Sequence, residues 1–182
     1  MKRGCSAPRR KTSELRKLRT LAWSDSLPQR LQCIKALWDI VDEPSARDFI
    51  LGLLSHLLGD RSQNVRWGAL HLANRLSSES HDGLWPLIVQ WGSATNKDTR
   101  MGVACFLLEH FLESDFRQYF AMTQVEIEKG NKRLAFTLAY CMKFGQAKRS
   151  RNARQFDQYV ERLAQADNDI RELLVDRKKK SS

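Results

Sequence analysis

An apolar stripe with helical spacing recurs along most of this sequence and limits the folds that the chain can adopt. After Pro44, apolar side chains follow one another at intervals of three and four residues, as on one face of an α-helix, and Gly59 ends the run. The members of this stripe are Ala46, Phe49, Ile50, Leu53, Leu54, Leu57 and Leu58. The alternation of apolar and polar residues typical of strands is nowhere sustained. The sequence therefore predicts an all-α protein.

The recurring stripes, and the Gly and Pro residues between them, predict about ten helices. The expected spans are 12–22, 28–41, 44–58, 63–77, 83–92, 97–113, 115–129, 131–144, 148–165 and 167–177. The connections are only a few residues long, and short connections make consecutive helices antiparallel neighbours. Paired in this way, the helices give about five hairpins. We expect these hairpins to stack as a right-handed α-solenoid.

An internal repeat supports this expectation. Three of the expected second helices begin with related strings, which are NVRWGA at 64–69, DTRMGV at 98–103 and NKRLAF at 131–136. Their arginines are Arg66, Arg100 and Arg133, spaced 34 and 33 residues apart. Two positions after these arginines come the small residues Gly68, Gly102 and Ala135, which would let neighbouring helices approach closely. A fixed period of about 20–50 residues is typical of solenoid proteins.

One stretch carries a family resemblance. Residues 60–66 (DRSQNVR), followed by Ala69 and Leu72, resemble the turn and second helix of a HEAT repeat, and the resemblance covers roughly residues 26–145. It implies an armadillo-like scaffold that presents a surface to a partner, and it implies no particular activity. We expect a HEAT-like repeat domain over 12–176 and basic flexible tails over 1–11 and 177–182. The predicted function is a non-catalytic scaffold without a cofactor, which binds a protein or a nucleic acid.

The positive charge of the chain is concentrated in three stretches. The net charge is +10. Residues 1–20 hold eight Lys or Arg and one acid, residues 143–154 hold five and none, and residues 171–182 hold five and two. These stretches together carry +15, so the rest of the chain carries −5. One interpretation is a surface for DNA or another polyanion, and the other is a set of solvated charges that keep the protein in solution.

The repeated arginines also have two interpretations. If the second helices line the concave face of a solenoid, these arginines could contact phosphates along it. Alternatively, each arginine pairs with an acid of the preceding turn, such as Asp60 or Asp98. Under the first interpretation, the nucleic-acid-binding residues are Arg66, Arg100, Arg133, Lys148, Arg149, Arg151 and Arg154.

A second family resemblance suggests an enzyme as the alternative. The string WDIVD at 38–42 resembles a Trp-Asp-x-Val-Asp segment of the alkylpurine DNA glycosylases that are built from HEAT-like repeats. The string WGSATN at 91–96, followed by Arg100, resembles a later segment of that DNA alkylation repair family. The resemblance implies that Trp38 would stack on a damaged base and that Asp42 would stabilise positive charge on the sugar. The competing interpretation makes Trp38 a core residue and Asp42 a residue at a helix end.

Other chemistries find no support in the sequence. The cysteines Cys5, Cys33, Cys105 and Cys141 form no C-x-x-C pair, so we expect reduced residues of an intracellular protein and no metal site. There is no Gly-rich phosphate loop, zinc-protease motif or nucleophile elbow. No apolar run approaches the ~20 residues of a membrane helix. We expect a cytoplasmic protein. Association with a nucleoid or a nucleus is the alternative.

Overall fold

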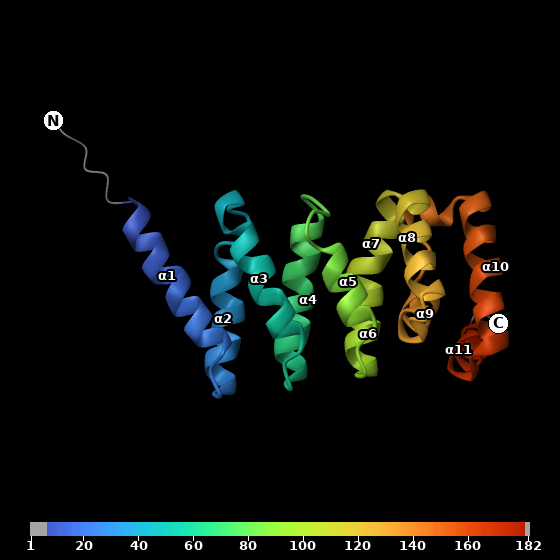
Figure 1. The fold of residues 1–182 in the computed structure, drawn as a ribbon, viewed down its shortest axis with the longest axis horizontal. Helices are drawn as coiled ribbons and strands as arrows, with labels where there is room; N and C mark the ends of the chain where they lie inside the picture. The colour runs from blue at the N-terminus through green and yellow to red at the C-terminus, as the bar shows by residue number, and fades with distance from the viewer. Residues whose placement is uncertain (1–6, 181–182) are drawn as a thin grey trace. The chain divides into compact units, whose positions relative to one another are not determined.

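The computed structural model describes residues 7–180, without the side chains of residues 7–12, 178 and 180. Within these residues the protein is all-α, about 80% helical, and contains no strand (Figure 1). The helices are α1 (Ala7–Ala22), α2 (Leu27–Trp38), α3 (Arg47–Leu58), α4 (Gln63–Ser77), α5 (Trp85–Gly92), α6 (Lys97–Val103), α7 (Glu109–Ser114), α8 (Phe116–Glu128), α9 (Lys132–Tyr140), α10 (Ser150–Ala166) and α11 (Asn168–Lys180). A π-helical segment, η2 (Ala104–Leu108), joins α6 to α7, and counting these three as one gives ten helices in the described part.

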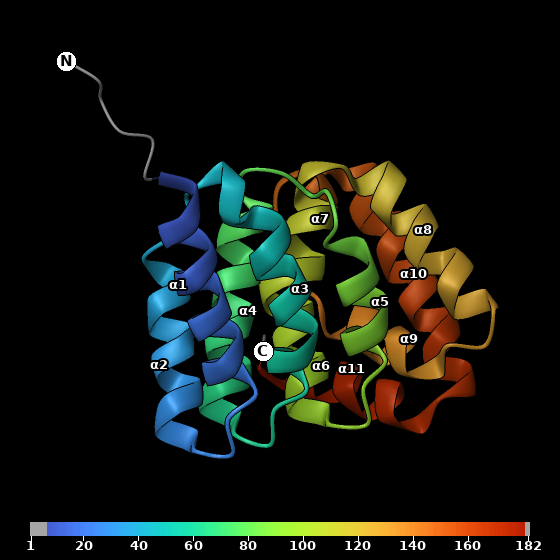
Figure 2. The same cartoon turned by 60° about the vertical axis from the view of Figure 1, so that its left-hand side comes forward.

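The chain divides between Ser80 and His81 into two compact units. In the first unit α1 packs along α2 and α3 packs along α4, while α2 also contacts α4 and α1 contacts α3 (Figure 2). The core between them contains most of the stripe expected after Pro44. Ile50, Leu53, Leu54, Leu57 and Leu58 are buried, and Phe49 is half-buried. The helical stripe therefore identified the buried face of α3 correctly.

Gly68 lets two helices of the first unit approach each other closely. A Cβ atom added at Gly68 of α4 would lie 2.7 Å from Cγ2 of Ile34, which belongs to α2. Ile34 is β-branched and has little rotamer freedom on a helix, so it could not easily move away. The expectation that a small residue at this position permits close helix packing is confirmed for Gly68.

In the second unit α9 is the central helix, in contact with α5, α6, α8, α10 and α11. Its residues 134–139 are all buried, which is typical of a helix covered on every side. Aromatic rings fill the space between α8 and α10. Phe116 and Phe120 stack with centroids 4.7 Å apart, and Phe120 also contacts the rings of Phe156 and Tyr159.

Two helices end earlier than the sequence predicts. Helix α2 stops at Trp38 instead of residue 41, and Glu43 has extended backbone because Pro44 disfavours helical geometry in the residue before it. Helix α9 stops at Tyr140 instead of residue 144. Arg177 of α11 donates hydrogen bonds to the carbonyl oxygens of Ala139 and Tyr140, which would otherwise accept the next helical bonds.

The terminal helices extend further than the sequence predicts. Helix α1 begins at Ala7 and α11 continues to Lys180, so helical backbone occupies part of both stretches expected to be flexible tails. Residues 1–6 and 181–182 lie outside the described residues. Lys and Arg have high helix propensity, so a basic run without an apolar stripe can extend a helix that its neighbours have started.

No helix in residues 7–180 has both the length and the apolar character that crossing a membrane would require.

Candidate nucleic-acid interface

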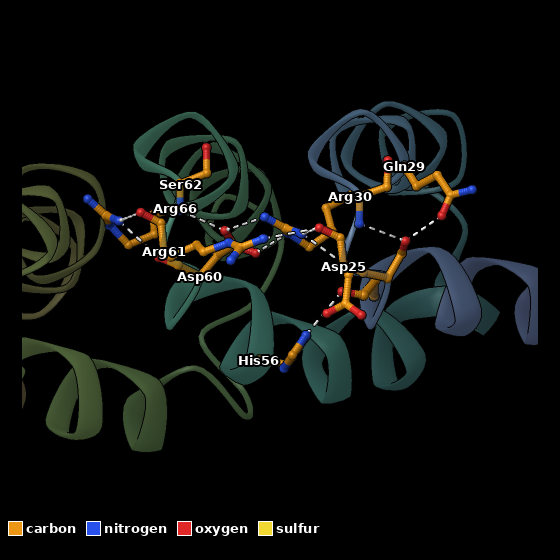
Figure 3. Close-up of polar contacts among 11 residues, drawn as sticks. Asp25, Gln29, Arg30, His56, Asp60, Arg61, Ser62 and Arg66 are labelled. Carbon is orange, nitrogen blue, oxygen red and sulfur yellow. Dashed lines mark hydrogen bonds and ion pairs between the residues drawn. The ribbon is translucent and has the colours of Figure 1, made fainter.

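Two of the repeated arginines are buried, and they hold the loops before their own helices. Nη1 of Arg66 donates to the carbonyl oxygens of Asp60 and Arg61, at 2.9 and 3.1 Å (Figure 3). Nη1 of Arg100 donates in the same way to the carbonyl oxygens of Ala94 and Thr95, at 2.7 and 3.0 Å. The two arginines are only 7% and 9% exposed. Their guanidinium groups therefore already serve the fold, and a phosphate contact by either one stays a prediction.

Arg30 is a third member of this set, and the sequence analysis missed it. Its Nη1 donates to the carbonyl oxygens of Ser24 and Asp25, at 2.8 and 2.9 Å. Arg30, Arg66 and Arg100 all lie four positions after the residue that precedes their helix, which is Ser26, Ser62 or Asn96. The signal that could have found Arg30 is this constant offset from a Ser or Asn at the N-cap.

Arg133 does not belong to this set, so its predicted equivalence with Arg66 and Arg100 is wrong. Helix α9 begins after Asn131, whose side-chain oxygen accepts a hydrogen bond from the backbone N–H of Leu134. Arg133 is only two positions past this cap and is exposed, and Ala135 takes the place of the arginine. The string NKRLAF is therefore aligned with the other two strings two residues out of register. The helix starts at its N-cap, and in this repeat the N-cap lies only two residues before the arginine.

An acidic side chain connects two successive loops of the first unit. Nε of Arg30 lies 2.6 Å from Oδ2 of Asp60, and both side chains are almost fully buried. Oδ1 of Asp60 also accepts a hydrogen bond from the backbone N–H of Ser62 at 2.7 Å, and Arg61 donates to the carbonyl oxygen of Asp25 at 3.1 Å (Figure 3). Asp60 was one candidate partner for the arginine of its own repeat, but its carboxylate forms an ion pair with Arg30 of the preceding helix pair.

Four basic side chains just before α10 and in its first turns differ from the buried arginines in exposure and in bonding. We call Lys148, Arg149, Arg151 and Arg154 the basic cluster. All four side chains are exposed, and none forms an ion pair or a side-chain hydrogen bond with the part of the chain that the structure describes. Lys143, the fifth base of this stretch, is neutralised by Asp157, with Nζ 2.5 Å from Oδ1. The basic cluster therefore presents uncompensated positive charge to solvent.

The backbone of α10 adds to this positive charge. Arg149 precedes the helix, no side chain accepts a hydrogen bond from its first turn, and that turn contains no acid. The first N–H groups of a helix and its dipole both favour an anion at this end. A phosphate placed here would meet backbone donors and the basic cluster together.

The loop before α10 holds the basic cluster in place. It includes η3 (Gly145–Lys148), where Ala147 is buried and Gly145 has a φ of 44°. The side-chain amide of Gln146 donates to the carbonyl oxygen of Ser114, and Asn152 donates to the carbonyl oxygen of Gln146 at 2.8 Å. The cluster is thus anchored to the core of the second unit.

Trp38 and Asp42 are both at the surface. Trp38 is 42% exposed, so the interpretation that it is a core residue is wrong: α2 ends at this residue, and Leu37 fills the core position instead. The side chain of Asp42 is 65% exposed, and its Oδ1 lies 2.7 Å from Nη2 of Arg75. A mainly apolar cavity of about 540 Å³ lies near this segment and is lined by Glu14, Leu15, Lys17, Leu18, Leu21, Ala36, Asp39, Ile40, Glu43, Ser45 and Ala46. Neither Trp38 nor Asp42 lines it.

The second string of the glycosylase resemblance has structural roles. The side chain of Asn96 caps α6 by accepting a hydrogen bond from the backbone N–H of Thr99 at 3.2 Å. Arg100 holds the preceding loop, as described above, and its guanidinium also lies 5.1 Å from the centre of the Phe136 ring. The nitrogen of the Trp91 ring is buried without a hydrogen-bond partner in the described part of the chain.

Burial shifts the pKa values of several titratable groups in the core. Burial raises the pKa of the Cys33 thiol to about 11 and raises the pKa of Cys141 as well, so both thiols stay protonated. Cys33 and Cys141 are buried, Cys105 is exposed, and Cys5 lies outside the described residues. Burial also raises the pKa of Glu109, although a hydrogen bond from the backbone N–H of Met142 acts in the opposite direction. Within residues 7–180, no group of His, Cys, Asp and Glu side chains could hold a metal ion.

Comparison of the chain with known protein families, with curated proteins and with solved structures found no match.

Proposed function

We propose that this protein is a non-catalytic scaffold that binds DNA through its phosphates, with the basic cluster of α10 as the contact surface. The main observation behind the proposal is the contrast between two sets of basic residues. Arg30, Arg66 and Arg100 are buried and bonded within the protein, whereas the basic cluster is exposed, unpaired and located at a helix N-terminus. Basic side chains and helix N-termini are the usual partners of nucleic-acid phosphates.

In this proposal, the helices form a HEAT-like solenoid of about five hairpins. The repeated Arg30, Arg66 and Arg100 support it, since each stabilises the same loop in successive helix pairs. The structural arginines hold the framework, and the basic cluster supplies the binding surface. Binding through phosphates alone has little sequence preference, because phosphates carry no sequence information.

A binding titration with a 30-base-pair duplex tests this function. We expect binding at 50 mM salt that weakens as salt rises, with log affinity falling against log salt by about 0.9 for each neutralised phosphate. Reversing the charge of all four residues of the basic cluster to Glu should reduce the affinity at least about tenfold and make this slope shallower.

The control variant carries the same number of reversals at exposed bases elsewhere, which are Lys35, Arg117, Lys129 and Lys132. It has the same net charge as the cluster variant, so a specific site predicts that it binds more tightly. Equal losses in the two variants would mean that net charge alone attracts DNA. Absence of a shift for the unaltered protein at 50 mM salt, with this duplex and with a single strand of the same length, would exclude the proposed function.

A second candidate function is excision of alkylated bases, and the joint exposure of Trp38 and Asp42 favours it. An exposed indole could stack on a cationic base, and an exposed carboxylate could face the sugar. If the protein is a glycosylase, it should release alkylated purines from methylated duplex DNA, and Asp42→Asn should abolish the release while leaving DNA binding unchanged. Failure of the unaltered protein to release any base would rule this candidate out.

A further inference from the structure

We infer that the basic cluster binds single-stranded nucleic acid in preference to duplex, with bases stacking on Phe144. This inference rests on the proposed function and specifies its ligand. It comes from the segment of the second unit that leads into the cluster, residues 141–144, which the sequence analysis had placed inside a helix.

The segment places two apolar side chains in solvent. Met142 is 54% exposed and Phe144 is 47% exposed, although the buried residues Cys141 and Ala147 lie on either side of this stretch. The backbone is extended at Cys141 and at Phe144, and alternate residues of an extended chain point to opposite sides. In agreement with this, Cys141 is buried and Lys143 bonds to Asp157, whereas Met142 and Phe144 are exposed.

Hydrogen bonds fix the segment in this conformation. The backbone N–H of Met142 donates to Oε1 of Glu109 at 2.7 Å, and the Glu109 side chain is itself buried. Arg177 donates to the carbonyl oxygen of Cys141 at 3.4 Å. The carbonyl oxygen of Phe144 accepts a hydrogen bond from the backbone N–H of Lys148 at 3.2 Å. The exposed Phe144 ring is thus presented on a fixed loop.

Phe144 immediately precedes the 3₁₀ segment η3 (Gly145–Lys148), which ends at Lys148, the first member of the basic cluster. The backbone N–H of Lys148 bonds back to the carbonyl oxygen of Phe144, and Arg149 follows. A surface that combines an exposed aromatic ring with several cations is typical of proteins that bind single strands, where the cations contact phosphates and the ring stacks on a base. A duplex keeps its bases stacked inside, so Phe144 could add little to duplex binding. Four unpaired cations beside only two apolar side chains favour a polyanion over a protein surface.

Fluorescence anisotropy with a labelled 20-nucleotide oligo-dT and a labelled 20-base-pair duplex tests the inference at one salt concentration. We expect tighter binding of the single strand. Phe144→Ala should weaken single-strand binding by about fivefold to a hundredfold, because stacking on one aromatic ring contributes this much. The same change should leave duplex affinity unaltered. Phe144→Trp should retain the preference for the single strand, since its ring can stack as well.

Val125→Ala is the matched control, because Val125 is an apolar residue of the same unit that is 49% exposed on α8. It should change neither affinity, and thermal unfolding should show that the Phe144 variants remain folded. Equal affinity for both ligands, with no effect of Phe144→Ala, would overturn the inference and leave the proposed function standing. Absence of binding to either ligand would overturn both. Phe144-dependent binding of a Glu-rich peptide without oligo-dT binding would overturn the inference in favour of a protein partner.

Discussion

Replacing Asp60 with Ala should lower the free energy of unfolding by about 3–5 kcal/mol, which is the usual effect of removing one partner from a buried ion pair. Asp60 and Arg30 are only 5% and 6% exposed at their side chains, and Nε of Arg30 lies 2.6 Å from Oδ2 of Asp60. Without the carboxylate, the Arg30 guanidinium remains buried and keeps only the carbonyl oxygens of Ser24 and Asp25 as acceptors. Urea unfolding followed by circular dichroism measures the change.

Two further variants separate the contributions at this site. Asp60→Asn keeps an oxygen that can accept the hydrogen bond from the backbone N–H of Ser62, so it should lose less stability than Asp60→Ala. Asp42→Ala removes an ion pair of similar length to Arg75, but this pair is exposed and should contribute about 1 kcal/mol or less. A cost for Asp60→Ala as small as that for Asp42→Ala would show that the buried pair does not stabilise the fold.

Arg100→Ala should lower the free energy of unfolding by about 2–4 kcal/mol, because two hydrogen bonds from a charged donor are lost. Nη1 of Arg100 bonds to the carbonyl oxygens of Ala94 and Thr95, and the guanidinium also lies over the Phe136 ring. Arg100→Lys should recover only part of the loss, since an ammonium lacks the planar fork of donors. Thermal unfolding of the purified variants measures both changes.

Arg133→Ala is the control for Arg100→Ala, because the sequence strings align these two arginines and the structure separates them. Arg133 is exposed, and its side chain forms no hydrogen bond or ion pair with the described part of the chain. Its replacement should change stability by about 0.5 kcal/mol or less. Equal losses of stability from Arg100→Ala and Arg133→Ala would show that the two arginines are equivalent, as the sequence strings suggest. That result would contradict the alignment of the repeats by their helix N-caps.

The pattern of apolar residues was enough to predict the all-α class, the approximate spans of the helices and the buried face of α3. These properties follow from apolar residues at helical spacing and from Pro and Gly at the ends, which are local features of the chain. The sequence also pointed to the basic stretch at 143–154, because net charge is additive along a chain. The stripe after Pro44 became the core of the first unit for these reasons.

Which individual side chains are buried or exposed depends on tertiary contacts. Trp38 continues an apolar stripe but lies at the surface because α2 ends there, whereas Arg66 is charged but buried because its loop supplies carbonyl acceptors. Phe144 was expected on a helix, but Arg177 of α11 bonds to the carbonyl groups at the end of α9, and the chain continues as an extended segment. Burial and helix ends depend on partners that are distant in the sequence, and periodicity within one segment contains no information about those partners.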